Sequence, residues 1–131
     1  MKNIYFILLV ALLGFASCQE PKVNEVTIVS PEEVQTLLDM EDVQLVDVRT
    51  SKEYTAENIP GAQNIDFNSP TFDEDILKLD KSRPVILYCQ KGGSSSKCAA
   101  KLKDAGFIKV YDLDGGITKW KFRGMDMKRK S

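Results

Sequence analysis

The chain has 131 residues, of which 43% are hydrophobic and 28% charged, and its formal net charge is −1. These values are typical of one soluble globular domain, exclude a disordered chain and favour no nucleic-acid partner. The sequence contains no histidine, which excludes imidazole-based hydrolysis and histidine metal sites. Cys89 and Cys98 alone cannot complete a zinc site, so we expect neither a metal nor another cofactor.

The first eighteen residues form a segment of their own. Lys2 supplies a positive start, and the run from Ile4 to Ala16 is apolar almost throughout. This run is shorter than the roughly 20 residues of a transmembrane helix and is typical of a secretory signal peptide. It leads into FASC, which resembles the bacterial lipoprotein processing site. Residues 1–18 are therefore predicted to be a signal peptide that ends at a lipidated Cys18; a conventional signal peptide with an incidental cysteine is the alternative.

The resemblance to a lipoprotein implies an exported protein that acyl chains such as palmitate hold at a bacterial membrane, on a periplasmic or outer-membrane face. Residues 19–25, QEPKVNE, are polar and contain a proline, which is typical of a short tether. We interpret residues 125–131 as a solvated basic tail, which leaves 26–124 as the folded domain. No long apolar stripe suggests self-association, so we expect a monomer.

Short β-branched runs alternate with helical segments along this domain. Strands are predicted at residues 26–29, 43–49, 63–65, 84–88 and 109–113. Helices are predicted at residues 30–39, 51–54, 72–79 and 95–105, and after the double glycine at 115–116. Ser30 and Ser51 are the expected N-terminal caps, and Gly106 is expected to end the fourth helix. The alternation predicts an α/β fold whose central, mostly parallel sheet carries helices on both faces.

In such sheets, ligands bind beyond the C-terminal ends of the strands. Asp47 and Arg49 lie at the end of the second predicted strand, and Cys89 directly follows VILY, the most apolar one. Cys89 is therefore placed where a site residue would be.

The loop CQKGGSS lies between this strand and the start of a helix. Its glycines allow backbone N–H groups to turn inward as an anion-binding nest, and the helix dipole adds positive potential. A cysteine at that point is favoured as a nucleophilic thiolate, and the loop also offers a lysine cation and serine hydroxyl donors. The predicted binding loop comprises Gln90, Lys91, Gly92, Gly93, Ser94 and Ser95. A buried structural cysteine is the alternative reading of Cys89.

Cys98 has a different pattern around it. It shares a helix face with Leu102 and Ala105, at the spacing of a core-facing stripe. We therefore expect Cys98 to pack in the core.

Three stretches, LVDVRTSKEYTAENIPGAQNI, PVILYCQKGGSSSKCAAKLKDAGF and VYDLDGGITKW, together resemble a single-domain rhodanese over about residues 26–122. The resemblance implies a sulfurtransferase in which a Cys89 persulfide carries sulfane sulfur. The donor would be thiosulfate, a persulfide or a polysulfide, and the acceptor a thiol or cyanide. Asp47, Arg49 and Glu53 match the family's DVR…EY pattern, which implies supporting roles: an Arg49–Glu53 ion pair and an acceptor at Asp47. The late GG…W motif is interpreted as turn geometry and packing.

The loop departs from its relatives in its cations. Phosphatase relatives carry an arginine six residues after the cysteine, where this chain has Ser95, so phosphatase or arsenate-reductase chemistry is disfavoured. Many active rhodanese loops carry arginines where this chain has Gln90 and Ser94, so we expect weaker binding of thiosulfate. Two other functions stay open: a non-catalytic binding module at the cell envelope, and a Cys89/Cys98 thiol–disulfide protein.

Overall fold

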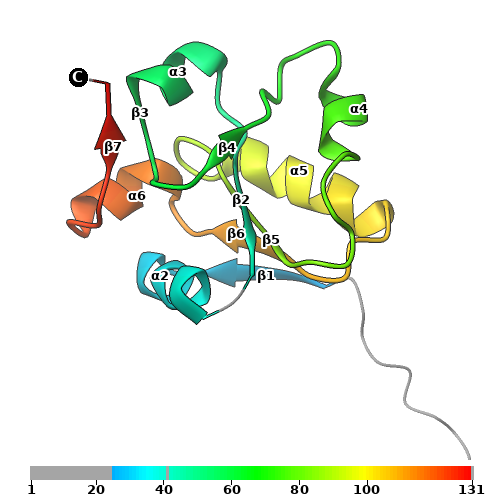
Figure 1. The fold of residues 1–131 in the computed structure, drawn as a ribbon, viewed down its shortest axis with the longest axis horizontal. Coiled ribbons are helices and arrows are strands. Elements are labelled where there is room, and N and C mark those ends of the chain that lie inside the picture. Colours follow the sequence, from blue (N-terminus) through cyan, green and yellow to red (C-terminus); the bar gives the residue numbers. More distant parts are fainter. Residues whose placement is uncertain (1–24, 41, 131) are drawn as a thin grey trace, which may run out of the picture.

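The computed structural model describes residues 25–40 and 42–130. Its centre is a five-stranded sheet of order β1-β6-β5-β2-β4, and every neighbouring pair of strands is parallel (Figure 1). The strands are β1 (Val26–Val29), β2 (Gln44–Asp47), β4 (Gln63–Asn64), β5 (Val85–Tyr88) and β6 (Val110–Leu113). The predicted mostly parallel sheet is confirmed.

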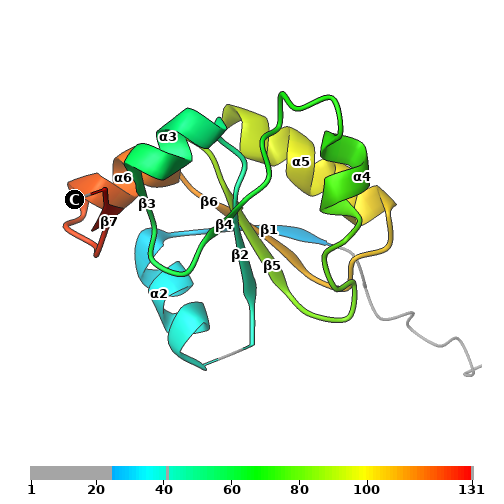
Figure 2. The ribbon, with the colours of Figure 1, turned by 45° about the horizontal axis from the view of Figure 1, so that its top comes forward.

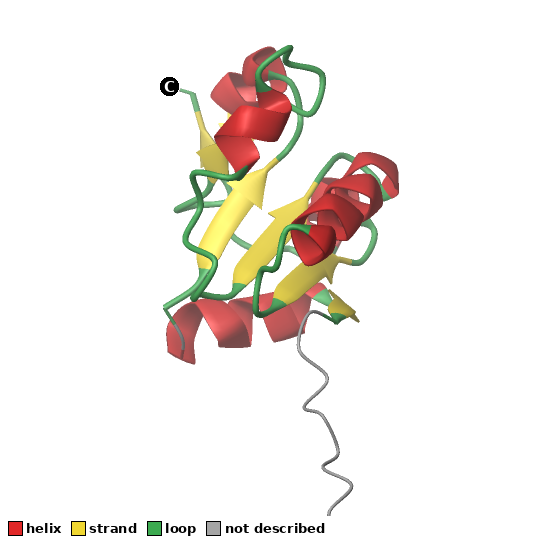
Figure 3. Cartoon of the chain, turned by 90° about the vertical axis from the view of Figure 1, so that its right-hand side faces the viewer, coloured by secondary structure: helices red, strands yellow, loops and turns green. Residues whose placement is uncertain are grey.

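Helices cover both faces of this sheet (Figures 2 and 3). The described residues form α2 (Pro31–Met40), α3 (Ser51–Ala56), α4 (Phe72–Ile76), α5 (Gly93–Asp104) and α6 (Gly116–Phe122). The central strand β5 contributes side chains to two hydrophobic cores, one on each face of the sheet, because successive side chains of a strand point to opposite faces. Val85 and Leu87 pack with residues of α4 and α5, whereas Ile86 and Tyr88 pack with residues of α2 and α6.

Local capping sets where two of the helices begin. Ser30 Oγ accepts a hydrogen bond from Glu33 N at 3.1 Å, as the sequence predicts. The cap of α3 is Thr50 and not Ser51: Thr50 Oγ1 accepts from Glu53 N at 3.2 Å, and the Glu53 carboxylate accepts from Thr50 N. This reciprocal capping box satisfies two backbone donors, which explains why the helix begins after Thr50.

The ends of the other helices differ slightly from the prediction. Helix α5 begins at Gly93, two residues before the predicted start, because Gly92 turns the chain at a φ of +117°. Gly106, at a φ of +92°, follows its last turn as predicted. Helix α4 is shorter than predicted and ends at Ile76.

The C-terminal segment folds back onto the domain. Lys128–Arg129 form β7, which pairs antiparallel with β3 (Glu57–Asn58), and Lys130 N donates to Ala56 O at 3.1 Å. Trp120 Nε1 also donates to Asp126 O at 2.8 Å. The domain therefore continues past the predicted boundary at residue 124. Backbone pairing holds the described part of the predicted tail, and its basic side chains are exposed.

The predicted signal peptide, the lipidated Cys18 and the tether up to residue 24 lie outside the described residues. Within the described part of the chain, no helix has the length and apolar character needed to span a membrane.

Candidate active site

The parallel register brings three strand ends to one edge of the sheet. Asp47, the last residue of β2, pairs with Tyr88, the last residue of β5, and Asp112 of β6 pairs with Leu87. Cys89 therefore leaves the sheet between the chain that follows β2 and the chain that follows β6, as the sequence predicts from the fold class.

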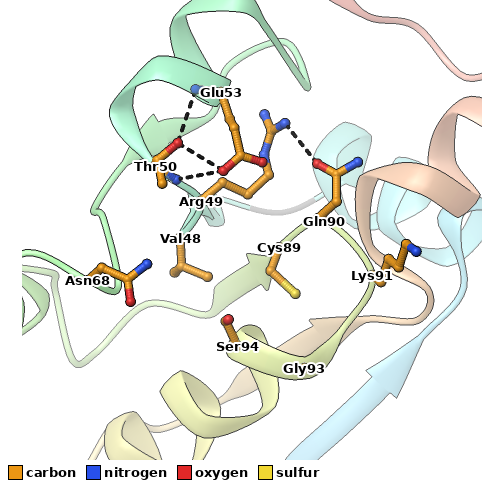
Figure 4. A pocket seen from close by; sticks show the side chains of 10 residues that line it. All are labelled: Val48, Arg49, Thr50, Glu53, Asn68, Cys89, Gln90, Lys91, Gly93 and Ser94. Atoms are coloured by element: carbon orange, nitrogen blue, oxygen red, sulfur yellow. Dashed lines mark hydrogen bonds between the residues drawn. The ribbon is translucent and has the colours of Figure 1, made fainter.

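A pocket of about 290 Å³ opens over Cys89 (Figure 4). Its volume lies near the lower limit for small-molecule sites, so it suits a small anion or the end of a thiol chain. Most of the predicted site residues line this pocket, but Gly92, Ser95 and Asp47 do not. The lining residues are Val48, Arg49, Thr50, Glu53, Asn68, Cys89, Gln90, Lys91, Gly93 and Ser94.

The Cys89 sulfur forms two hydrogen bonds although the residue is only 5% exposed. The backbone N–H of Gly92 donates to Sγ at 2.9 Å, and Sγ donates to Ser95 Oγ at 3.3 Å. The amide stabilises negative charge on the sulfur, and the start of α5 adds the positive end of a helix dipole. The predicted inward-turned amide is therefore present at Gly92, and Ser95 contacts the sulfur itself.

The predicted ion pair between Arg49 and Glu53 is wrong. Arg49 pairs with Asp47, since Nη2 lies 2.7 Å from Asp47 Oδ2 and Nε donates to both carboxylate oxygens at 3.0 and 3.1 Å. Glu53 is occupied by the capping box with Thr50. Burial works against the charge on Arg49, but the hydrogen bonds and the charge of Asp47 outweigh it and raise the Arg49 pKa.

This buried pair connects β2 to the cysteine loop. Asp47 Oδ1 accepts from the backbone N–H of Arg49 at 2.9 Å, which confirms its predicted role as a hydrogen-bond acceptor. Arg49 in turn donates to Glu57 O at 2.7 Å. It also donates to Gln90 Oε1 at 3.4 Å (Figure 4). The guanidinium of Arg49 therefore binds groups of the protein itself, and the carboxylate of Asp47 compensates most of the positive charge that a substrate could meet.

The remaining loop side chains surround the pocket. Figure 4 shows the Ser94 hydroxyl directed toward Cys89, and Lys91 at the right, beyond Cys89, with its nitrogen directed away from the sulfur. Lys91 is exposed and forms no ion pair with any described residue. It is therefore the pocket cation that remains available to an anionic substrate.

The late double glycine supports the loop directly, which the sequence analysis missed. Ile117 N donates to Cys89 O at 2.9 Å, and Thr118 N donates to Gln90 O at 3.1 Å. A Cβ on Gly116 would lie 2.5 Å from Cys89 O and 2.6 Å from Gln90 O. The start of α6 can approach the loop carbonyls only because residue 116 has no side chain. The GG motif was the available signal, but sequence reasoning gave it turn and packing roles alone.

Cys98 packs in the core, as predicted. It is fully buried on the same face of the sheet as Leu87 and Leu102. Burial, and then the nearby Cys89 charge, raise the pKa of the Cys98 thiol to about 12. Cys98 is therefore an inert thiol at neutral pH.

Comparisons with known proteins agree with this geometry. The rhodanese-like domain family matches residues 30–123. The thiosulfate sulfurtransferase GlpE of Pseudomonas fluorescens is 39% identical over 93 residues, which cover 71% of this chain and 83% of that protein. GlpE of Pseudoalteromonas translucida is 36% identical over 84 residues, which cover 64% and 78%. The crystal structure of a rhodanese-like domain protein from Staphylococcus aureus superposes with a TM-score of 0.67 at 27% identity, over 80% of this chain and 99% of that one.

The chain belongs to the rhodanese family, as its sequence motifs predict. The fold is the rhodanese fold, and the protein is a sulfurtransferase enzyme of the rhodanese type. Its partners include a small sulfur-containing substrate or a thiol.

Proposed function

We propose that this protein carries sulfane sulfur on Cys89, taking it from a persulfide or polysulfide and passing it to a thiol or to cyanide. The observation that carries the proposal is the Gly92 N–H, 2.9 Å from the Cys89 sulfur beside an open pocket. The same donor can stabilise a thiolate before the reaction and the terminal sulfur of a persulfide after it.

The two half-reactions follow from this arrangement. The Cys89 thiolate attacks the sulfane sulfur of a donor persulfide, so a new S–S bond forms at Sγ, the donor's S–S bond breaks, and the donor leaves as a thiolate that water protonates. An acceptor thiolate then attacks the outer sulfur of the Cys89 persulfide. That step breaks the S–S bond at Sγ and restores the Cys89 thiolate.

The charges around the pocket support a donor with low charge. Arg49 is paired with Asp47, and the carboxylate of Glu53 also lines the pocket. Among the described residues that line the pocket, Lys91 alone remains to attract an anion, so a divalent donor such as thiosulfate would bring one negative charge without a cationic partner. The anion of an organic persulfide or polysulfide, RSS⁻ or RSSS⁻, carries a single negative charge, which Lys91 alone can compensate.

Mass spectrometry of the domain from Gln19 onward tests the proposal. The purified protein is incubated with thiosulfate or with a monoanionic organic polysulfide, and the mass of the Cys89 peptide is measured. We expect one added sulfur, more with polysulfide than with thiosulfate, which cyanide removes and Cys89→Ser abolishes. Gln90→Arg adds a cation at the pocket and should increase the yield with thiosulfate. No added sulfur from either donor, in a folded protein whose Cys89 still reacts with iodoacetamide, would overturn the proposal.

We also propose that the enzyme is exported and held at a membrane by lipid on Cys18. The apolar run from Ile4 to Ala16 and the cysteine that follows it support this proposal. In a bacterial host, an alkyne fatty acid should label the full chain, and Cys18→Ala should lose the label and leave the membrane fraction. A wild-type chain that stays unlabelled would contradict it.

A further inference from the structure

The pocket over Cys89 carries one available charge of each sign. Arg49 is paired with Asp47, so the charges that remain among the described lining residues are the ammonium of Lys91 and the carboxylate of Glu53. Both side chains are exposed, and neither forms an ion pair with another described residue. A carboxylate at the mouth of a site repels a simple anion, so its presence points to a substrate that also carries a positive group.

Glu53 uses only one of its two carboxylate oxygens inside the protein. Its Oε1 accepts from Thr50 Oγ1 at 2.9 Å and from Thr50 N at 3.4 Å, which closes the capping box of α3. Its Oε2 accepts no hydrogen bond from any residue in the described part of the chain. A carboxylate that is fixed through one oxygen and open at the other is preorganised to bind a cation.

Neutral donors lie on other sides of the same pocket. In Figure 4, Glu53 is above Cys89, the Ser94 hydroxyl is below it, and the Asn68 amide is at the left, beyond Val48. The side chains of Ser94 and Asn68 form no hydrogen bond with any described residue. A hydroxyl and an amide both donate to carboxylates, and the Lys91 ammonium adds a cation on a flexible stem.

We propose that this pocket selects the persulfide of an α-amino-acid thiol, whose ammonium binds Glu53 Oε2 and whose carboxylate binds the donors on the other sides of the pocket. The inference rests on the proposed function, because it names the sulfur donor of that same site. One amino acid with a single thiol suits a pocket of about 290 Å³.

The charges of such a donor match those of the pocket. Its ammonium and carboxylate cancel, so its persulfide anion brings the same single net charge as that of a simple organic persulfide. It also places a positive group against Glu53, which would otherwise repel the donor. Thiosulfate has no positive group and meets the same repulsion without relief.

The transfer step balances as it does for other persulfides. The Cys89 thiolate attacks the outer sulfur, a new S–S bond forms at Sγ, and the S–S bond of the donor breaks. The amino-acid thiolate leaves and takes a proton from water. The ammonium and the carboxylate keep their charges throughout, so Glu53 acts in binding and not in bond breaking. Its removal should therefore change KM and leave kcat nearly unchanged.

Three persulfides that differ by one group test the proposal on the wild type. They are those of cysteine, of mercaptopropionate, which lacks the ammonium, and of cysteamine, which lacks the carboxylate. Sulfur transfer to cyanide is measured over a range of donor concentrations, and the rate with Cys89→Ser is subtracted as the uncatalysed background. We expect KM for cysteine persulfide to be about two- to fivefold lower than for each analogue, the effect of one exposed charge contact. A KM for either analogue as low as that for cysteine persulfide would overturn the proposal.

Glu53→Gln isolates the ammonium contact, because a glutamine at this position of a capping box still accepts from Thr50. It should raise KM about two- to fivefold for the persulfides of cysteine and cysteamine, but not for that of mercaptopropionate. No change, or an equal change for all three donors, would overturn the proposal.

Glu33→Gln is the matched control. Glu33 holds the same position in the cap of α2, where Ser30 Oγ donates to its Oε1 at 3.2 Å, and it lies outside the pocket. The variant removes the same charge from the same kind of cap, and all three KM values should stay at those of the wild type. A KM change that matches that of Glu53→Gln would mean that net charge alone is sensed, and it would overturn the assignment to Glu53.

Failure of this inference is distinguishable from failure of the proposed function. If mercaptopropionate persulfide loads Cys89 as well as cysteine persulfide does, sulfur transfer stands and the assignment of the donor fails. If none of the three persulfides adds a sulfur to Cys89, the proposed function itself fails.

Discussion

The surroundings of Cys89 and of Cys98 differ far more than the burial of the two residues does. Both are free thiols on the same side of the sheet, with exposures of 5% and 0%. Cys89 has a backbone amide at 2.9 Å, a serine hydroxyl at 3.3 Å and a pocket above it. Cys98 has a packed apolar environment that raises its pKa to about 12. The backbone N–H of Gly92 that donates to the sulfur, and not exposure alone, separates the reactive cysteine from the structural one.

The first and largest test exchanges each thiol in turn. Cys89→Ser should reduce persulfide formation and sulfur transfer to the background of the assay, because the nucleophile is gone. Cys98→Ala should keep both within about twofold and lower the free energy of unfolding by about 1 kcal/mol through the lost buried sulfur. Mass spectrometry and a sulfur-transfer assay to cyanide measure the two effects. A strong loss of transfer in folded Cys98→Ala would contradict the division of roles.

The second test removes the buried ion pair between Arg49 and Asp47, which lies beside the Cys89 pocket. Arg49→Met leaves Asp47 as a buried charge without a partner, so we expect about 3–5 kcal/mol lower stability in urea denaturation. The matched control breaks an exposed pair: Lys78→Met, which separates Lys78 from Asp75, should change stability by less than about 0.5 kcal/mol. Similar losses of stability in the two variants would show that the buried pair contributes no more to stability than an exposed one.

The third test moves the loop without touching a side chain that lines the pocket. Gly116→Ala places a Cβ against Cys89 O at a φ of +61°, so it should reduce sulfur transfer at least about tenfold and lower stability by about 1–3 kcal/mol. Gly106→Ala also forces a positive φ but meets no atom within 4 Å. It should lose stability alone and keep the transfer rate of the folded enzyme. Equal transfer rates in the two variants would contradict the role given to Gly116.

The fourth test concerns the available cation. Lys91→Gln should raise the KM for an anionic donor by up to about fivefold, since one exposed charge contributes at most about 1 kcal/mol. Added salt should produce the same change in the wild type. Lys97→Gln removes an exposed charge from α5 outside the pocket and should leave KM unchanged. Steady-state kinetics at two ionic strengths decide between these outcomes.

The last test concerns the alkaline stability that Cys98 confers. Its folded pKa of about 12 lies above the value of an unfolded thiol, near 8.5, so the unfolded state loses this proton first. The associated stability is fully present below about pH 8.5 and declines as the pH rises toward 12. Cys98→Ala should lose this part of the decline in urea denaturation between pH 8 and 10.5. Parallel curves for the two proteins would show that Cys98 is not protected by burial.

Much of the fold and the position of the nucleophile could be predicted from local patterns. The alternation of apolar strands and helices, the helix ends at Ser30 and Gly106, and a cysteine directly after the most apolar strand each depend on neighbouring residues. Such features are encoded within a few positions of the chain. The packing role of Cys98 followed in the same way from helical spacing.

Two contacts were not predicted, one of them local and one between distant segments. The partner of Arg49 is Asp47 and not Glu53, because the capping box at Thr50 competes for the Glu53 carboxylate. The pairing of β7 with β3 joins segments some seventy positions apart, and a basic stretch alone gives no indication of it.

The sequence by itself determined the α/β class, the family and the cysteine that carries the chemistry, since each depends on short motifs and their order. The tertiary structure alone decided how that cysteine is supported: by Gly116 against the loop carbonyls and by the hydrogen bond from Arg49 to Gln90. The reason is physical. Hydrogen bonds and burial depend on which strands become neighbours, and the order β1-β6-β5-β2-β4 brings together residues that the chain keeps far apart.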